Sequence, residues 1–246
     1  MNTQAIRDRD AAIEAMPNVS RGAKDRDRDL PRDGTKQAAP RRKPRPLAVG
    51  EARLPVSHYQ ARVRSKVKRQ AQSATPRTEY TAMKTLLEDR DERNRLNESL
   101  QRAGLHGEAL SDADRRTAHR IDSMIRRYEA RNDRETRSYT PVHLPEGVVG
   151  QLDEWVQPGD TFTLHGWSIA DLDAANVTSP DDDGEVLVEI RGRRGMYLGD
   201  STGTTSTYLL PRGVTLECEG AESADIIGTN GPIAHRKIIR FQIVGE

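Results

Sequence analysis

The sequence predicts an α+β fold behind a long N-terminal arm, and three observations lead to this prediction. Between residues 76 and 137 apolar residues recur with a helical period. After Tyr139 the period changes to that of short strands separated by turns. Residues 1–75 show almost no apolar periodicity and carry 18 Lys and Arg against 8 Asp and Glu. Residues 138–246 reverse this balance, with 7 against 17, so the two ends of the chain are expected to have different roles.

The composition limits how much of the chain can pack into a core. Only 34% of the 246 residues are hydrophobic and 4% are aromatic, so a core spanning the whole length is not expected. Cys218 is the single cysteine, which excludes an intrachain disulfide. No apolar run approaches the roughly 20 residues of a membrane span, and the first residues lack the apolar segment of a secretory signal. We therefore expect no membrane contact, no secretion by a signal peptide, and a place in the cytoplasm or in an assembly formed there.

Residues 1–75 are predicted to form an extended basic arm that is disordered unless a partner binds it. Arg and Asp alternate in this segment and prolines interrupt it, so it buries too little apolar surface to offset the entropy lost on ordering. Its basic residues are expected to bind an anionic partner, either nucleic acid without sequence specificity or an acidic protein surface. The residues in this set are Arg41, Arg42, Lys43, Arg45, Arg62, Arg64, Lys66, Lys68 and Arg69. The alternative interpretation is a linker kept soluble by its charge.

Two helical regions are predicted after the arm. Thr78–Ala103 has apolar residues at approximately helical spacing, with a polar middle at Asp89–Arg95 that interrupts it. Gly104 and Gly107 are expected to end this region. Ser111 is the expected N-cap of the next helix, because acidic residues follow it in the first turn. The apolar stripe of that helix consists of Ala118, Ile121, Ile125 and Tyr128.

The second half of the chain is predicted to form short strands. Segments of high strand propensity are Thr161–Leu164, Val186–Ile190, Tyr208–Leu210, Val214–Leu216 and Lys237–Val244. Pro-Gly combinations near residues 158 and 211 predict turns between them. Because helices come first and strands follow, we expect one α+β domain over residues 76–246, helical over 76–137 and β-rich over 138–246.

Short motifs follow one another between residues 96 and 213. They are Leu96-Asn97-Glu98 before a Gly-containing loop, Ile121-Asp122, Tyr139–Pro145, Gly166–Asp173 and Thr205–Gly213. In order and spacing, residues from about 80 to 246 resemble the exoenzyme-type mono-ADP-ribosyltransferase domain, which occurs in secreted bacterial toxins and fused to phage head proteins. The resemblance implies a helical lead-in followed by a mostly antiparallel β core of two sheets.

The resemblance also implies where the family's reaction would occur, and those positions are altered here. The family holds NAD with an arginine and uses a glutamate to stabilise an oxocarbenium-like state. By position, Thr140 replaces the arginine, while Thr205 and Thr207 replace the two glutamates of Glu-x-Glu. The family's Ser-Thr-Ser becomes either Ser168-Ile169-Ala170 or, one residue along, Ile169-Ala170-Asp171. Because hydroxyl groups carry no charge, no catalytic role is expected for Thr140, Ser168, Thr205 or Thr207.

Two functions from different classes follow from the sequence. The first is a non-catalytic structural or interaction protein, a pseudoenzyme on a degenerate transferase fold. It is expected in a phage virion as a head, minor capsid or connector component, bound through its N-terminal arm to capsid or portal-type subunits. The alternative is an active NAD-dependent mono-ADP-ribosyltransferase or toxin that uses non-standard residues. NAD is a cofactor only under the alternative, and six histidines without paired spacing indicate no metal site.

Overall fold

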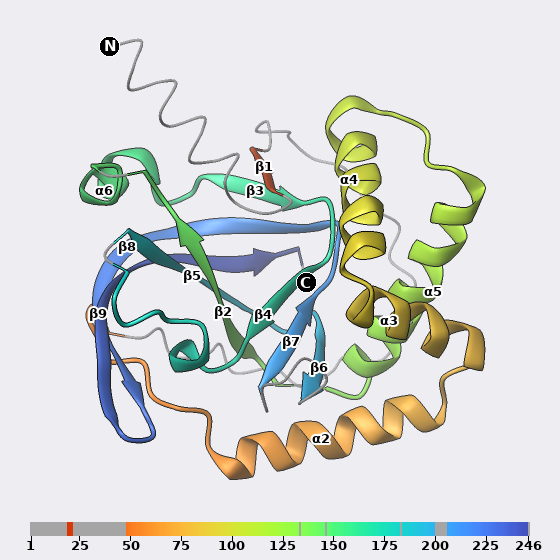
Figure 1. The fold of residues 1–246 in the computed structure, drawn as a ribbon, viewed down its shortest axis with the longest axis horizontal. Helices are drawn as coiled ribbons and strands as arrows, with labels where there is room; N and C mark the ends of the chain where they lie inside the picture. The colour runs from red at the N-terminus through yellow and green to blue at the C-terminus, as the bar shows by residue number, and fades with distance from the viewer. Residues whose placement is uncertain are drawn as a thin grey trace.

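The computed structural model describes residues 19–21, 48–132, 134–145, 147–182, 184–199 and 206–245. Its long helices are α2 (His58–Ser73), α3 (Arg77–Glu88), α4 (Arg90–His106) and α5 (Asp112–Glu129). In Figure 1, α3, α4 and α5 group together on the right, and α2 runs along the bottom of the molecule. All but one of the described strands follow these helices in the chain, which confirms the predicted α+β class.

The prediction of an extended arm was wrong for residues 58–73, which form α2. Ser57 begins this helix with a capping box: its Oγ accepts the N–H of Gln60 at 3.3 Å, and the Gln60 side chain accepts the N–H of Ser57 at 3.2 Å. The fully buried side chains of α2 are Arg64 and Ala71. The apolar pattern did not predict this helix, because the buried Arg64 stands at a position where an apolar residue is usual. Residues 1–18 and 22–47 of the predicted arm lie outside the described residues.

Asp89 divides the predicted helix Thr78–Ala103 into α3 and α4. Its backbone is extended, and its Oδ1 accepts the N–H of Glu92 at 2.9 Å, so Asp89 is the N-cap of α4. Gly107 ends α4 in the left-handed conformation, with φ 70°. Gly104 was expected to end the helix but lies inside it. A Cβ at Gly104 would lie 2.0 Å from Nδ1 of His165, so the missing side chain lets this imidazole approach the helix.

A single hydrogen-bonded sheet contains nine described strands. They are β1 (Val19–Arg21), β2 (Thr136–His143), β3 (Thr161–Leu164), β4 (Ser168–Asp171), β5 (Glu185–Gly192), β6 (Met196–Gly199), β7 (Thr207–Leu210), β8 (Val214–Gly228) and β9 (Gly231–Val244). Their order across the sheet is β1-β3-β8-β9-β5-β2-β4-β7-β6, and the pairing of β5 with β9 is parallel while the others are antiparallel. The connections contain the short helices η1 (Val149–Gln151), α6 (Leu152–Trp155) and η2 (Ala174–Asn176).

The prediction of two separate sheets was therefore wrong. The pairing of β2 with β4 joins two groups of strands: one contains β1, β3, β8, β9, β5 and β2, and the other contains β4, β7 and β6. Within the described residues this pairing has one registered residue pair, Tyr139 with Asp171. We call this place the junction. It unites what would otherwise be two sheets, and it brings three strands together at one point.

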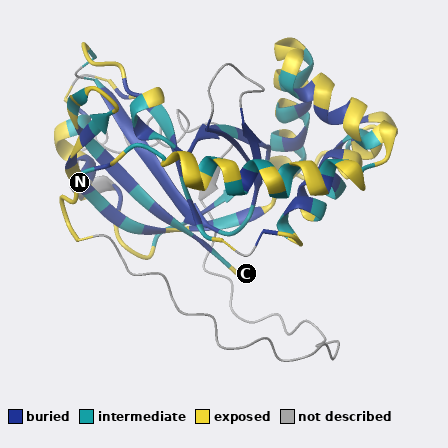
Figure 2. Cartoon of the chain, turned by 90° about the horizontal axis from the view of Figure 1, so that it is seen from below, coloured by how far each residue is buried: buried dark blue, intermediate teal, exposed yellow. Residues whose placement is uncertain are grey.

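The core lies between the helices and the sheet and along the strands (Figure 2). The predicted stripe of α5 is confirmed, since its four residues are at most 1% exposed. Phe162 of β3 and Phe241 of β9 meet edge to face, with ring centroids 5.4 Å apart. A second, smaller apolar cluster packs η2 onto the central strands beside the junction. The junction is therefore buried rather than solvated.

Candidate functional site

Four side chains from the sequence motifs meet where the helices join the sheet. Asn97 of α4 pairs with the backbone of Trp167: its Nδ2 donates to the carbonyl at 3.0 Å, and its Oδ1 accepts the N–H at 3.1 Å. The indole Nε1 of Trp167 donates to Oδ1 of Asp122, on α5, at 3.1 Å. Arg212 donates to the other oxygen of Asp122 at 2.7 Å and lies 5.8 Å from the centroid of the Trp167 ring. These motif residues therefore hold α4 and α5 to the ends of β4 and β7.

A row of buried polar side chains crosses the junction. Tyr139 of β2 lies opposite Asp171 of β4, and Asp171 lies opposite Thr207 of β7. Residues directly opposite in antiparallel strands place their side chains on the same face of the sheet. Glu189 of β5, opposite Tyr139, extends the row. All four residues are at most 5% exposed. We call them the polar row.

Asp171 is the hydrogen-bond acceptor at the centre of the polar row. Its Oδ1 accepts from the hydroxyl of Ser206, from Nδ2 of Asn176 at 3.2 Å and from the N–H of Asp173 at 2.8 Å. Asn176 also donates to the hydroxyl oxygen of Ser206 at 2.7 Å. Because these donors come from η2 and from the residue before β7, the carboxylate holds the loops around the junction in place.

Arg53 makes two buried ion pairs beside the polar row. Its Nε lies 2.7 Å from Oε2 of Glu189, and its Nη2 lies 2.5 Å from Oε1 of Glu222, with all three side chains at most 2% exposed. Burial opposes ionisation, but the charge of Glu189 and the hydrogen bond to Glu222 outweigh it and raise the pKa of Arg53. Burial also opposes ionisation of Glu222, yet hydrogen bonds from Arg53 and the N–H of Gly50 lower its pKa. The charges of these pairs therefore stabilise one another.

The segment Glu51–Val56, which we call the strap, is anchored to β8 and to the loop that follows β4. Arg53 forms a β-bridge with Ile226: its N–H donates to the carbonyl of Asp225 at 2.8 Å, and its carbonyl accepts the N–H of Ile227 at 2.9 Å. The N–H of Val56 donates to Oδ2 of Asp173 at 3.2 Å. Burial raises the pKa of Asp173, although the hydrogen bonds that its carboxylate accepts act to lower this pKa. The strap therefore connects α2 to the junction.

Two pockets lie beside the strap. A pocket of about 510 Å³ lies between the strap, Arg64 of α2 and the side chains of Arg137 and Tyr139. A second pocket of about 590 Å³ lies between α2 and the ends of β4 and β6. Its polar lining includes Arg62, Lys68, Arg69, Asp173, Asn176 and Ser206. Cationic side chains on one wall and a carboxylate on the other make the second pocket suitable for a polar ligand.

Of the altered family positions, Thr207 is the one that the described structure places in the polar row. Thr140 lies next to Tyr139 on β2 and opposite Val188, so its side chain is on the other face of that strand. Ser168 lies three residues before Asp171, which places it on the other face of β4. Thr205 lies outside the described residues. The sequence allowed two alignments of the family's Ser-Thr-Ser motif. The second, Ile169-Ala170-Asp171, therefore contains a residue of the polar row, Asp171.

The basic residues predicted to bind an anion divide into two groups on α2. Arg62, Lys66 and Arg69 are exposed. Arg64 is only 8% exposed, and burial lowers the pKa of its guanidinium. Nearby tyrosines oppose this shift without cancelling it. Lys68 donates from Nζ to the carbonyl of Leu198 on β6. Arg64 therefore lies against the domain, and Lys68 attaches α2 to β6. Arg41, Arg42, Lys43 and Arg45 lie outside the described residues.

Sequence patterns did not reveal Arg53, Glu189 and Glu222 as functional residues. Glu189 left a signal, because it is a charged residue inside the apolar segment Val186–Ile190, and a buried charge requires a partner. Arg53 left none, because its two partners are 136 and 169 residues away in the chain. The described residues contain no group of three or more His, Cys, Asp or Glu placed to hold a metal ion. None of the described helices is long and apolar enough to span a membrane.

Comparison with known proteins gives matches among solved structures. No protein-family model matches the chain, and no curated protein matches it. Plx2a, an ADP-ribosyltransferase toxin from Paenibacillus larvae, superimposes with a TM-score of 0.57 at 13% identity, over 76% of this chain and 96% of the toxin. The chain has the fold of an ADP-ribosyltransferase toxin.

Two further structures agree with this assignment. The Clostridium limosum C3 exoenzyme superimposes with a TM-score of 0.54 at 13% identity, over 75% of this chain and 92% of the exoenzyme. The enzymatic component C2-I of the Clostridium botulinum C2-toxin gives 0.57 at 12% identity over 75% of this chain, which spans 47% of that longer protein. At these identities the likeness shows the fold alone, and the predicted ADP-ribosyltransferase-like fold is confirmed to that extent.

The two carboxylates of the polar row contact other residues of the chain. Asp171, opposite Thr207, accepts three hydrogen bonds at Oδ1. Glu189, at the end of the row, is fully buried and ion-paired with Arg53 of the strap.

Proposed function

We propose that this chain is a non-catalytic structural or interaction protein built on an ADP-ribosyltransferase-like fold. The observation that carries the proposal is the engagement of Asp171 by Ser206, Asn176 and the backbone of Asp173, opposite a neutral Thr207. Loss of one preorganised electrostatic group costs an active site about 10²- to 10³-fold in rate. The polar row serves instead to hold three strands and the strap together.

We further propose that the protein is a phage virion component, in the head or the connector, that assembles in the host cytoplasm. The support is its resemblance to transferase domains fused to phage head proteins, together with the basic N-terminal region that continues into α2. Capsid or portal-type subunits are its proposed partners, bound through the N-terminal residues. Binding through the N-terminal residues would leave the folded domain at the surface of an assembly.

Radiolabelled NAD tests the proposal of inactivity. The purified full chain is incubated with NAD labelled in the adenylate part and with a mixture of acceptor proteins, beside an active exoenzyme-type transferase. We expect neither free ADP-ribose nor labelled protein above the level of a heat-denatured sample. Specific hydrolysis or transfer by the full chain would overturn the proposal.

A second candidate, an active NAD-dependent mono-ADP-ribosyltransferase or toxin with non-standard residues, is favoured by the pocket of about 590 Å³. It combines the cations of α2 with Asp173, whose pKa is raised by burial. Such a carboxyl group is a candidate acid–base residue. If the full chain turns over NAD, Asp173→Asn should abolish the reaction, whereas Asp112→Asn, at an exposed carboxylate, should not. Equal rates in both variants would exclude this candidate.

Purification of particles tests the virion proposal. Gradient-purified phage should contain the chain at a fixed ratio to the major capsid subunit, measured by quantitative mass spectrometry. Trypsin should cut residues 1–47 of the isolated chain and spare them in the particle. Absence of the chain from purified particles would contradict the proposal, whatever the NAD assay shows.

A further inference from the structure

Helix α5 separates its charges between two faces. Its acids point toward the domain: Asp114 accepts Arg95 at 2.7 Å, Asp122 accepts Arg212 at 2.7 Å, and Glu129 accepts Arg194 at 2.9 Å. In each pair the arginine belongs to another part of the chain. The negative charges of α5 are therefore neutralised on its inner side, apart from Asp112 at its exposed first turn.

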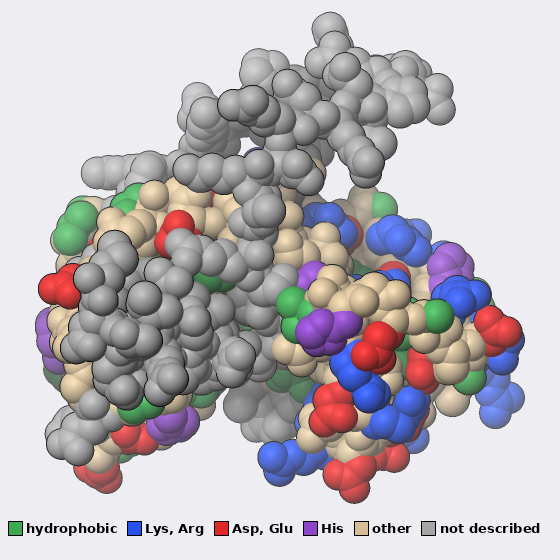
Figure 3. All heavy atoms as spheres, turned by 90° about the horizontal axis from the view of Figure 1, so that it is seen from above, with side chains coloured by type: hydrophobic (Ala, Val, Ile, Leu, Met, Phe, Trp, Pro, Cys, Tyr) green, Lys and Arg blue, Asp and Glu red, His purple; other side chains and the backbone are tan. Residues whose placement is uncertain are grey.

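The outer face of α5 is cationic. Arg116, Arg120 and Arg126 are exposed, and no described carboxylate lies within ion-pair distance of any of them. Their positions, with His119 between them, fall on one side of a helix with 3.6 residues per turn. We call Arg116, Arg120 and Arg126 the α5 ridge. On the face drawn in Figure 3, Lys and Arg are mixed with Asp and Glu over the helical part. The ridge is therefore defined by arginines that have no described ion-pair partner, and not by the net charge of this face.

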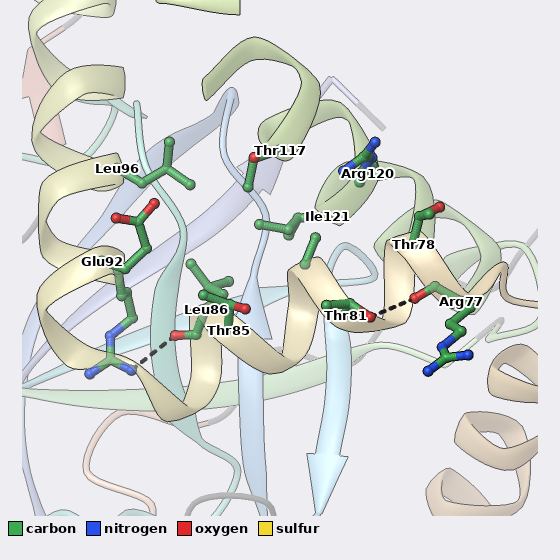
Figure 4. A pocket seen from close by; sticks show the side chains of 12 residues that line it. Arg77, Thr78, Thr81, Thr85, Leu86, Glu92, Leu96, Thr117, Arg120 and Ile121 are labelled. Carbon is green, nitrogen blue, oxygen red and sulfur yellow. Dashed lines mark hydrogen bonds between the residues drawn. The ribbon is translucent and has the colours of Figure 1, made fainter. Parts of the chain in front are cut away.

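A pocket of about 410 Å³ lies beside the ridge, between α3, α4 and α5 (Figure 4). Arg120 and Thr117 line it from α5, and Arg77 and Thr78 line it from α3. Glu92 is its one acidic lining residue among those described, and Arg95 binds this carboxylate at 2.7 Å. Guanidinium and hydroxyl groups are the usual protein donors to phosphate oxygens.

We propose that the α5 ridge and this pocket bind the phosphate backbone of nucleic acid without sequence specificity. An acidic protein is the less suitable partner, because the centre of a protein interface is apolar. The pocket is also lined by Ala82, Leu86, Leu96 and Ile121, but these residues are at most 9% exposed and belong to the core. The large hydrophobic residues exposed in the described structure are Val49, Leu54, Tyr59, Tyr80 and Leu105, and none lies on α5 or lines the pocket. Contacts to phosphates need only charge and hydrogen-bond donors, which the ridge and pocket supply.

The experiment measures binding of the full chain to a fluorescent 24-base-pair DNA duplex of mixed sequence as salt increases from about 50 to about 200 mM. The test variant carries Arg116→Gln, Arg120→Gln and Arg126→Gln. It should bind at least about tenfold more weakly at low salt, and the slope of log K against log salt should fall by about 0.9 for each phosphate that the variant no longer neutralises. Circular dichroism and Tm should stay unchanged, because the three side chains make no ion pair with described residues.

A matched variant removes three exposed charges from α3 and α4 that line neither pocket: Lys84→Gln, Arg90→Gln and Arg102→Gln. It should keep the wild-type salt slope, which separates the α5 ridge from the general positive charge of the helical part. A duplex RNA of the same length identifies which nucleic acid is preferred. The proposal fails if the wild-type chain binds neither duplex at low salt, or if both triple variants bind alike. It also fails if labelled polyglutamate binds the ridge more tightly than either duplex, which would assign the ridge to an acidic protein.

Discussion

Tyr139 of β2 and Asp171 of β4 lie directly opposite each other, and within the described residues they are the single registered pair that joins the two parts of the sheet. The same carboxylate lies opposite Thr207 and accepts hydrogen bonds from Ser206 and Asn176. Strands β2, β4 and β7 and the helix η2 thus depend on one buried side chain. In the polar row Asp171 therefore has a structural role.

Asp171→Ala should destabilise the protein by about 1–3 kcal/mol, because the buried hydroxyl of Ser206 is left without its carboxylate acceptor. Asn176 also loses this acceptor, but it is exposed and can bond to water instead. Urea unfolding followed by circular dichroism measures the change. Asp112→Ala, at an exposed ion pair, is the control and should have a much smaller effect. Equal losses in both variants would show that Asp171 does not support the junction.

A double-mutant cycle of Asp122→Ala and Arg212→Ala should give an interaction free energy of about 0.5–3 kcal/mol between these two residues. Asp122→Ala should cost more than Arg212→Ala, because it also removes the acceptor of the Trp167 indole N–H. Free energies of unfolding of the four proteins give the coupling. Strict additivity of the two substitutions would exclude the network as the connection between α5 and the sheet.

Arg53→Ala should destabilise the protein by about 3–5 kcal/mol, because it leaves Glu189 and Glu222 as uncompensated buried charges. It should also speed proteolysis within residues 48–73, since Arg53 attaches the strap to the sheet. Arg95→Ala removes two ion pairs from a half-exposed arginine and should cost less. Unfolding midpoints and a timed digestion read by mass spectrometry measure both effects. An Arg53 variant as stable as wild type would mean that the strap is not anchored there.

The contribution of Glu222 to stability should depend on pH. Burial opposes its ionisation, but hydrogen bonds from Arg53 and Gly50 lower its folded-state pKa. A lowered folded pKa gives stability that is fully present above the unfolded value of about 4.3 and is lost as the pH falls through the folded pKa. Glu222→Gln should therefore lower Tm at neutral pH, and the difference from wild type should shrink in acid. A difference that stays constant across the acid range, relative to the exposed control Glu217→Gln, would contradict this account.

Gly104→Ala should fail to stabilise α4, although alanine normally gains about 1 kcal/mol over glycine inside a helix. The new Cβ would lie 2.0 Å from Nδ1 of His165, so the imidazole has to move. In a His165→Ala background the same substitution should raise Tm. Thermal unfolding of the four proteins decides this, and a similar gain in both backgrounds would rule out the steric role of His165.

Local patterns predicted much of the helical and strand structure. Ser111 as an N-cap, the stripe of α5 and the strand Thr161–Leu164 are all found in the structure, because caps and side-chain periods depend on residues close in the chain. The order of the motifs also indicated the ADP-ribosyltransferase-like fold, which the solved structures support. Helix α2 was missed because Arg64 occupies its buried face, and no local pattern marks an arginine as buried.

The sequence by itself determined the α+β class and most element positions, and the predicted replacement of the family's glutamate by Thr207 remains a prediction. Only the tertiary structure decided that there is one sheet, that Asp171 lies opposite Thr207, and that Arg53 pairs with Glu189 and Glu222. The physical reason is distance along the chain. Strand register and buried ion pairs join residues far apart in sequence, whereas caps and periodicity involve neighbours, which a sequence displays directly.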